Sequence, residues 1–219
     1  KLLGRVEGTY FPSATAQTLS GELFYASTQG EIELLGLREK ELLKRRLRGV
    51  EIGMVFQREG LFTGLSVLDN VRWPMLLQGI STDEATARSE TILASVELVG
   101  DRDVATLSGG ERKRLALART LVWEPRVLLL DEPFTGLDPR ALEGLLELTA
   151  RFAEREDRTV IMVTHQEADI RRLGDHLIIM NRGQVALSGD RAAHEETLER
   201  FLEGEKVEHL VGASAPQTL

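Results

Sequence analysis

Short apolar runs alternate with longer amphipathic stretches along this chain, and that alternation restricts its fold more than any other feature of the sequence. Runs rich in leucine and β-branched residues predict strands, whereas stretches with apolar residues at helical spacing predict helices. Strands that alternate with helices form a largely parallel sheet, so we expect an α/β fold. The expected strands lie at residues 21–26, 31–35, 52–56, 127–130, 159–163, 176–180 and 184–187.

Helical patterns fill residues 66–122, where the strand signal disappears. The middle helix of this block should begin at Ser81, because Ser81 and Glu84 have the spacing of a capping box, and it should end at Gly100. Its expected apolar face consists of Ile92, Leu93, Val96 and Val99. This block therefore predicts an all-helical insert in the α/β domain.

Three further segments complete the expected organisation of the chain. Residues 39–48 predict a basic helix, and Asp138 followed by Pro139 predicts a helix start, since aspartate caps helices and proline suits the first helical position. Periodicity is lost over residues 205–219, which we expect to be a C-terminal tail. The rest, residues 1–204, is expected to form a single domain.

Composition excludes several classes of function. The chain has 27 lysines and arginines against 35 aspartates and glutamates, a net charge of −8, so we expect no nucleic-acid partner. Cysteine is absent, which excludes disulfides, thiolate zinc sites and a cysteine nucleophile. The longest aliphatic run, residues 127–130, is far shorter than the roughly 20 residues that a spanning helix needs.

Two segments carry residues suited to chemistry. The apolar strand expected at 127–130 ends in Asp131 and Glu132, and the carboxyl ends of strands are where α/β sheets bind ligands, although a solvated loop would read the same way. Ser108–Glu111 (Ser-Gly-Gly-Glu) precedes a helix, and bare backbone N–H groups at a helix N-terminus attract anions. An ordinary capped helix is the alternative for the second segment.

The order of these residues along the chain is more specific than any one of them. Ser108 follows Gln57 by 51 residues, Asp131 follows after another 23, Asp138 after seven more, and His165 comes just after the strand expected at 159–163. This order resembles the ATP-binding subunit of ABC transporters over residues 1–204. The matching motifs are the Q-loop (55–57), the signature (107–111), the Walker B strand (127–132), the D-loop (136–138) and the switch histidine (164–165).

The resemblance implies a P-loop NTPase fold of the ABC type, with a RecA-like core, an antiparallel β subdomain and a helical subdomain at about residues 63–122. It also implies ATP and Mg²⁺ as cofactors. Asp131 would hold Mg²⁺ through water, and Glu132 would act as general base on the attacking water. His165 would contact the γ-phosphate, while Gln57 would contact Mg²⁺ and relay nucleotide occupancy to a membrane partner.

The same resemblance implies two kinds of partner. Ser108, Gly109, Gly110 and Glu111 would close over the ATP of a second ATP-binding subunit, identical or different, with Asp138 at the same dimer seam. Transmembrane permease subunits would hold the protein at the cytoplasmic face of the inner membrane as a peripheral subunit. Leu61 and Phe62 would line the groove that receives a short permease helix.

The phosphate-binding loop of the family, Gly-x-x-x-x-Gly-Lys-Ser/Thr, does not occur in the sequence. Residues 12–18 could be a degenerate version, with Gln17 in place of the lysine. Alternatively, the loop would stand immediately before Lys1, residues 2–3 would open the helix that follows it, and Gly8 would end that helix; a first residue other than methionine agrees with this second alignment.

The cargo is less well indicated than the family. Residues 57–78 are similar to lipid-transport ATPases of the Mla/Mce type and to lipoprotein-extracting ones, and residues 201–204 are also similar to the Mla/Mce type. Two alternative functions are a soluble ABC ATPase without a permease and a subunit with a degenerate phosphate loop that is active only in a mixed dimer. Intact Glu132 and His165 argue against a regulatory subunit that does not hydrolyse ATP.

Overall fold

The computed structural model describes residues 2–7, 20–27, 30–33, 51–57, 59–181 and 184–205, with side chains described from residue 51 onward except at 58 and 181–184. The chain divides into two compact units, Leu42–Arg172 and a second unit made of Lys1–Glu41 with Leu173–Leu219. The helix expected at 39–48 lies outside the described residues.

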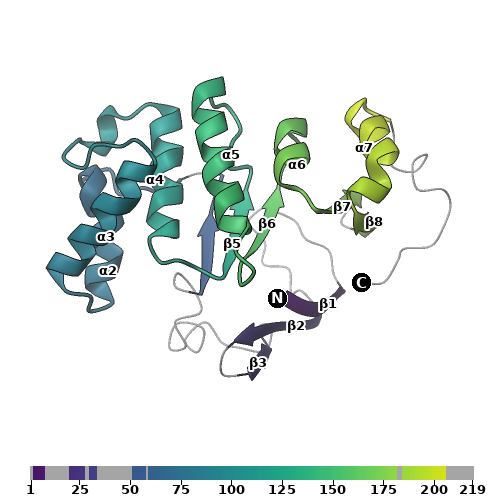
Figure 1. Cartoon of the computed structure of the whole chain (residues 1–219), viewed down its shortest axis with the longest axis horizontal. Helices are drawn as coiled ribbons and strands as arrows, with labels where there is room; N and C mark the ends of the chain where they lie inside the picture. The colour runs from purple at the N-terminus through teal and green to yellow at the C-terminus, as the bar shows by residue number, and fades with distance from the viewer. Residues whose placement is uncertain are drawn as a thin grey trace. The chain divides into compact units, whose positions relative to one another are not determined.

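The first unit contains a parallel sheet with β5 at its centre (Figure 1). Its strands are β4 (Ile52–Val55), β5 (Val127–Asp131) and β6 (Thr159–Val163), in the order β4-β5-β6. All three were predicted from the sequence and are confirmed. Val127, Leu128 and Leu130 are buried, as expected for a central strand covered on both sides.

Close packing against β4 requires a glycine at position 53. A Cβ atom there would lie 2.5 Å from Cγ2 of Thr120 in α4 (Gly109–Leu121) and 2.9 Å from Pro125. Thr120 also donates a hydrogen bond from its hydroxyl to the Met54 carbonyl oxygen over 3.4 Å. The sheet and α4 are thus held together by direct contact between backbone and side chain.

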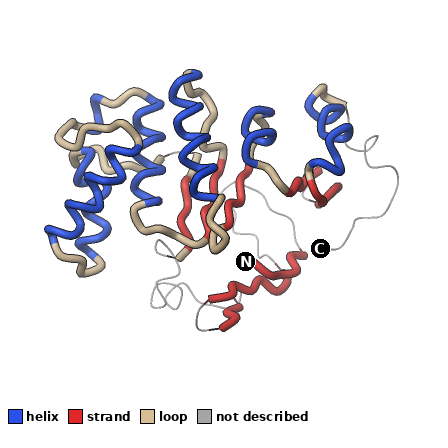
Figure 2. Tube along the Cα trace, in the orientation of Figure 1, coloured by secondary structure: helices blue, strands red, loops and turns tan. Residues whose placement is uncertain are grey.

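Three helices pack against one another beside this sheet (Figures 1 and 2). They are α2 (Val67–Leu77), α3 (Thr82–Ser95) and α4, with the short 3₁₀ helix η1 (Val104–Thr106) preceding α4. Their shared core includes Val67, Val71, Met75, Leu93 and Leu115. Burial of these side chains is the main driving force for the helical subdomain, at roughly 1.5–3 kcal/mol for each one.

The start of α3 matches the prediction, but its end does not. Ser81 caps the helix by accepting the backbone N–H of Glu84 over 3.3 Å. The helix ends at Ser95 rather than at Gly100, and Val99, expected on its buried face, is 61% exposed. The reason is a Schellman motif: the N–H of Leu98 donates to Leu93 and that of Glu97 to Ala94, with Glu97 at φ 54°.

Two further helices follow β5 and β6. They are α5 (Pro139–Ala153) and α6 (Glu167–Leu173). Asp138 caps α5 by accepting the N–H groups of Arg140 and Ala141, each over 3.1 Å, and Pro139 occupies the first turn. The predicted helix start is therefore confirmed, and α5 buries Leu145 and Leu146.

The described residues of the second unit form antiparallel strands, a short 3₁₀ helix and an α-helix. One sheet has the order β1-β2-β3, from β1 (Leu2–Glu7), β2 (Ser20–Ser27) and β3 (Gly30–Glu33). A hairpin pairs β7 (His176–Asn181) with β8 (Gln184–Asp190) and is followed by η2 (Ala192–His194) and α7 (Glu195–Leu202). The predicted strands at 21–26, 176–180 and 184–187 are confirmed, and the one at 31–35 is confirmed over residues 31–33, with residues 34–35 outside the described part of the chain.

The prediction of a helix that begins at residues 2–3 and ends at Gly8 is wrong. Residues 2–7 form β1, which pairs along its whole length with β2, from Leu2 opposite Tyr25 to Glu7 opposite Ser20. Six residues are too few for a stable isolated helix, and Gly4 within them disfavours one by about 1 kcal/mol, so the backbone hydrogen bonds of a strand pair prevail. Residues 12–18, the other candidate segment, lie outside the described residues.

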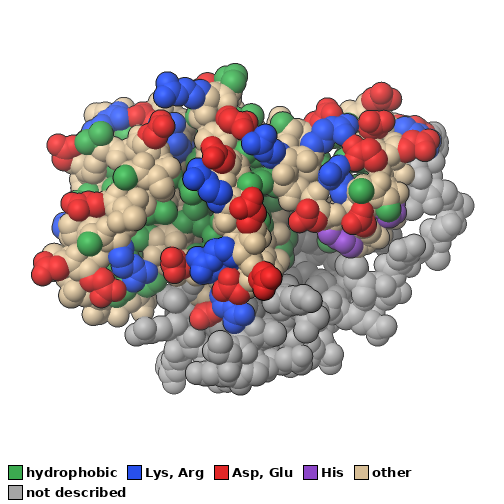
Figure 3. Space-filling view, viewed as in Figure 1, with side chains coloured by type: hydrophobic (Ala, Val, Ile, Leu, Met, Phe, Trp, Pro, Cys, Tyr) green, Lys and Arg blue, Asp and Glu red, His purple; other side chains and the backbone are tan. Residues whose placement is uncertain are grey.

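Charge is mixed over the visible surface of the described residues. Figure 3 shows acidic and basic side chains side by side on that face, without a broad area of one sign. Within the described part of the chain, no helix combines the length and apolar character needed to cross a bilayer.

Candidate functional site

The carboxyl edge of the parallel sheet gathers the predicted catalytic and metal-binding residues. Asp131 ends β5 and Glu132 follows it, while Gln57 and His165 come just after β4 and β6. Because the three strands are parallel and in register, these chain ends meet at one edge of the sheet. The structure thus brings together residues from three distant parts of the sequence.

Glu132 and His165 contact each other directly at this edge. The Nδ1 atom of His165 lies 3.0 Å from Oε1 of Glu132, and the Thr135 hydroxyl donates to Oε2 of Glu132 over 3.2 Å. The side-chain amide nitrogen of Gln166 lies 2.9 Å from Nε2 of His165, so both ring nitrogens of the histidine have a polar neighbour. The histidine side chain is 63% exposed and that of the glutamate 25%, which leaves the pair open to a ligand.

The backbone of Glu132 is in an unusual conformation. Its φ is 43°, in the left-handed region that residues other than glycine rarely adopt. The N–H of Glu132 donates to the Val163 carbonyl oxygen over 2.9 Å, which fixes the residue against the end of β6. Such conformations persist only where the surrounding structure holds them, and they cluster at functional sites.

A buried acid supports the turn that carries His165. The Thr164 hydroxyl donates to Oδ2 of Asp169 over 2.7 Å and accepts the N–H of Gln166 over 3.0 Å. Asp169 is 1% exposed, and this burial raises the pKa of its carboxyl against the opposing effects of Thr164, His165 and Lys113. Sequence analysis missed Asp169, because an acidic residue in the first turn of a helix is common and nothing in the pattern indicates burial.

The N-terminus of α4 has the predicted capping box. The Ser108 hydroxyl accepts the N–H of Glu111 over 3.2 Å, and Glu111 accepts the N–H of Ser108 over 2.8 Å. Hydrogen bonds from Arg102 and then from the Ser108 backbone lower the pKa of Glu111 to about 2. Glu111 is therefore ionised and engaged within the protein, which orients the turn rather than leaving this carboxylate free for a ligand.

The two glycines of the signature differ in their surroundings. A Cβ atom at Gly109 would meet nothing within 4 Å, so its backbone is open to an incoming group. A Cβ at Gly110 would lie 3.5 Å from Leu137, 3.6 Å from Ala141 and 3.8 Å from an oxygen of Asp138. The signature and the D-loop of this chain thus lie side by side.

The donor atoms present fit the predicted cofactors. Among the described residues, no three histidine or acidic side chains cluster to form a metal site of their own. Asp131 and Gln57 offer a carboxylate and an amide oxygen, and Mg²⁺ is usually held by one or two such ligands together with phosphate oxygens and water. The backbone N–H groups of Gly109 and Gly110, in the first turn of α4, are suited to phosphate.

The chain belongs to the ABC transporter family, whose model matches residues 13–135, more than half of the chain. Its fold is the ABC type of P-loop NTPase, with a RecA-like core, an antiparallel β subdomain and a helical subdomain. A solved relative is the dimeric ATP-binding cassette MJ0796 bound to ADP and Pi, which has a TM-score of 0.70 and 29% identity over 80% of this chain and 75% of that one.

Curated relatives carry names of import ATP-binding proteins. The methionine import protein MetN of Latilactobacillus sakei is 33% identical over 174 residues, covering 78% of this chain and 51% of the relative. The sulfate/thiosulfate import protein CysA of Gloeobacter violaceus is 39% identical over 162 residues, covering 73% and 46%. The chain spans about half the length of the curated relatives it matches.

Proposed function

We propose that this chain is the ATP-hydrolysing subunit of an ABC transporter. The observation that carries the proposal is the pair formed by Glu132 and His165, whose Oε1 and Nδ1 atoms are 3.0 Å apart at the carboxyl edge of the sheet. An accessible carboxylate that is oriented by two neighbours is suited to accept a proton from water. The names of the relatives and the ADP- and Pi-bound dimer of MJ0796 support the same function.

Each residue of the site has a proposed task. Glu132 takes the proton of the attacking water, and His165 holds Glu132 in place while its exposed ring faces the phosphate. Asp131 and Gln57 hold Mg²⁺ together with the phosphates of ATP; the metal neutralises phosphate charge when bound. The hydrogen bonds from Glu132 N–H to Val163 and from the Thr135 hydroxyl to Glu132 hold the carboxylate in position, against its unfavourable backbone conformation, before the nucleotide arrives.

A second ATP-binding subunit is the proposed partner at the signature. The open backbone at Gly109, in the first turn of α4, presents N–H groups to the phosphate of the opposing subunit, and the capping box at Ser108 holds this turn in place. Gly110 and Asp138 lie side by side, so both belong to the same proposed dimer seam. Glu111 supports this surface by holding the cap rather than by touching the nucleotide.

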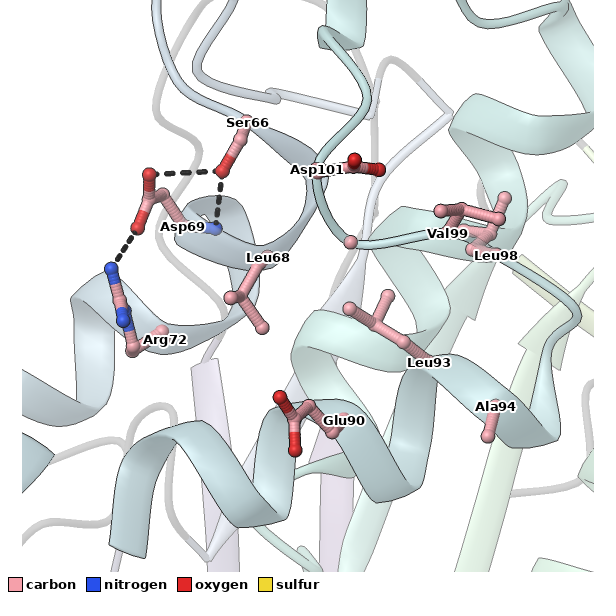
Figure 4. Close-up of a pocket in the computed structure, with 11 residues that line it drawn as sticks. Ser66, Leu68, Asp69, Arg72, Glu90, Leu93, Ala94, Leu98, Val99 and Asp101 are labelled. Atoms are coloured by element: carbon pink, nitrogen blue, oxygen red, sulfur yellow. Dashed lines mark hydrogen bonds and ion pairs between the residues drawn. The ribbon is translucent and has the colours of Figure 1, made fainter. Parts of the chain in front are cut away.

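Permease subunits are the proposed membrane partner, which would place the protein at the cytoplasmic face of the inner membrane as a peripheral subunit. The helical subdomain has a groove of about 670 Å³ between α2, α3 and the segment that follows α3 (Figure 4). Asp69 and Arg72 form an ion pair on one side, and Leu93 and Val99 add apolar surface. This groove could accept a short amphipathic segment.

Leu61 and Phe62, the residues predicted from the sequence to contact a permease helix, lie outside this groove. Leu61 packs against the helical core, and Phe62 lies under the Arg119 guanidinium, 5.7 Å from the ring centre. Neither lines the groove of Figure 4, so their contact with a permease stays a prediction.

For the transported substrate, the names of the relatives are the available guide. Their names specify import of methionine, sulfate/thiosulfate and ferric ions, and none of these is a lipid. Lipid or lipoprotein transport rests only on the sequence similarities of residues 57–78 and 201–204. Co-purification with a permease would separate a transporter subunit from a soluble ABC ATPase.

The test of the proposed function is Glu132→Gln in the full-length protein. Loss of a positioned general base should lower the ATPase rate by about 10²- to 10⁴-fold while ATP binding is retained. Glu154→Gln, which neutralises an exposed acid at the end of α5, is the matched control and should keep the wild-type rate. Hydrolysis by Glu132→Gln within a few-fold of wild type would refute the assignment.

A further inference from the structure

We propose that Lys113 is a positioning residue for ATP hydrolysis, because it holds the loop that carries Glu132. The inference rests on the proposed function, since it assigns a second residue to the same reaction. Lys113 lies in the second turn of α4, five residues after the cap Ser108, and neither the sequence motifs nor the roles described above involve it.

A short chain of contacts joins Lys113 to the catalytic carboxylate. The Nζ atom of Lys113 donates a hydrogen bond to the backbone carbonyl oxygen of Thr135. The hydroxyl of the same Thr135 donates to Oε2 of Glu132 over 3.2 Å. Thr135 therefore accepts the lysine hydrogen bond with its backbone carbonyl and orients Glu132 with its side-chain hydroxyl.

The charges around Lys113 favour this position. Carboxylates of Glu59, Glu132 and Asp169 each attract the ammonium group and raise its pKa, although partial burial has the larger effect and lowers it. Glu59 follows the Q-loop, Glu132 follows β5, and Asp169 bonds to Thr164 beside His165. A single cation thus faces acids from the three segments that leave the carboxyl edge of the sheet.

The conformation of Glu132 explains why such a support is needed. Its φ of 43° is unfavourable, so the loop would relax if its contacts were removed. The bond from Glu132 N–H to Val163 fixes one side of the residue, and the bond from Lys113 to Thr135 fixes the other. A displacement of about 1 Å at a reacting group can lower a rate by about 10²-fold.

The contact also links two parts of the site. Because α4 begins at the signature, its hydrogen bond to Thr135 joins the surface proposed to meet a second subunit to the loop of the general base. Lys113 acts on the reaction through Glu132 and has no contact with nucleotide in this scheme.

The kinetic test compares Lys113→Met with Lys113→Arg and with Arg151→Met, an exposed control on α5. Lys113→Met should lower kcat by about 10²-fold with little change in KM for ATP, and Lys113→Arg should recover part of the loss. In a Glu132→Gln background, Lys113→Met should have no further effect on single-turnover rates, because both residues act through one carboxylate. The proposal would be overturned if Lys113→Met had the kcat of wild type, or if Lys113→Met lowered the single-turnover rate as strongly in the Glu132→Gln background as in wild type.

A second readout does not depend on ATPase activity. Hydrogen exchange of backbone amides at residues 134–137, measured on the 219-residue chain, should be several-fold faster in Lys113→Met than in wild type or Arg151→Met. If the full-length protein hydrolyses no ATP, the proposed function fails, and hydrogen exchange alone decides the role of Lys113. Equal exchange in wild type and Lys113→Met would show that the lysine does not hold the loop.

Discussion

At the scale of single residues, Asp169 combines nearly complete burial with a hydrogen bond that a neutral side chain could also make. We expect Asp169→Ala to destabilise the protein by about 1–3 kcal/mol, because the Thr164 hydroxyl loses its acceptor. Asp169→Asn should cost less, since its amide oxygen can still accept that bond and no buried charge remains. Urea unfolding of the three proteins at neutral pH measures both differences.

The difference in stability between wild type and Asp169→Asn should depend on pH in a definite direction. Burial raises the folded pKa of Asp169 above the ordinary value of 3.8, so the unfolded chain releases its proton first as pH increases. Wild type should therefore lose stability relative to Asp169→Asn from about pH 4 up to the raised folded pKa, and the difference should then stay constant. Equal pH profiles for the two proteins would contradict the assigned shift.

Site residues that belong to recognisable sequence motifs could be predicted from the sequence. Residues that matter only through their contacts in the folded protein could not. Asp131, Glu132 and His165 were found because each follows a strand at a family-like spacing. Thr135 and Lys113 are ordinary in type and position, and they matter only because α4 packs beside the loop after β5. The roles of all these residues remain predictions.

At the scale of elements, strands and helix starts were predicted better than helix ends. Apolar runs mark strands, and serine or aspartate marks a cap, so β4, β5, β6 and the starts of α3 and α5 followed from local residues. The end of α3 did not, because the left-handed position that closes its Schellman motif is occupied by Glu97 instead of glycine. The segment of β1 was misread because its partner β2 lies elsewhere in the sequence.

Glu97 offers a direct test of this explanation. Glu97→Gly should stabilise the protein by about 0.5–1 kcal/mol, since glycine adopts a positive φ without steric cost. The exposed ion pair with Arg140, at 4.0 Å, should contribute little to the balance. Glu90→Gly in the interior of the same helix is the matched control and should destabilise by a similar amount. Urea unfolding that shows equal effects at both positions would contradict the assigned helix end.

At the scale of the whole molecule, the site has a general base but the sequence has no recognisable phosphate-binding loop. The dipeptide Gly-Lys does not occur in the 219 residues. In phosphate-loop enzymes, backbone N–H groups and a lysine surround the phosphates, and each charge-assisted bond contributes roughly 1.5–3 kcal/mol. Losing two such bonds would weaken binding by on the order of 3–6 kcal/mol, or about 10²- to 10⁴-fold.

We therefore expect the 219-residue chain to bind Mg-ATP weakly even though its proposed catalytic residues are in place. Asp131 and Glu132 cannot compensate, because two carboxylates repel phosphate unless Mg²⁺ is bound between them. The signature would remain able to cover the ATP of a partner, so a mixed dimer with one complete subunit should hydrolyse at a single site. Titration of a fluorescent ATP analogue with Mg²⁺ should show a dissociation constant well above the micromolar range. Micromolar affinity would mean that residues 12–18, or another segment of this chain, bind the phosphates.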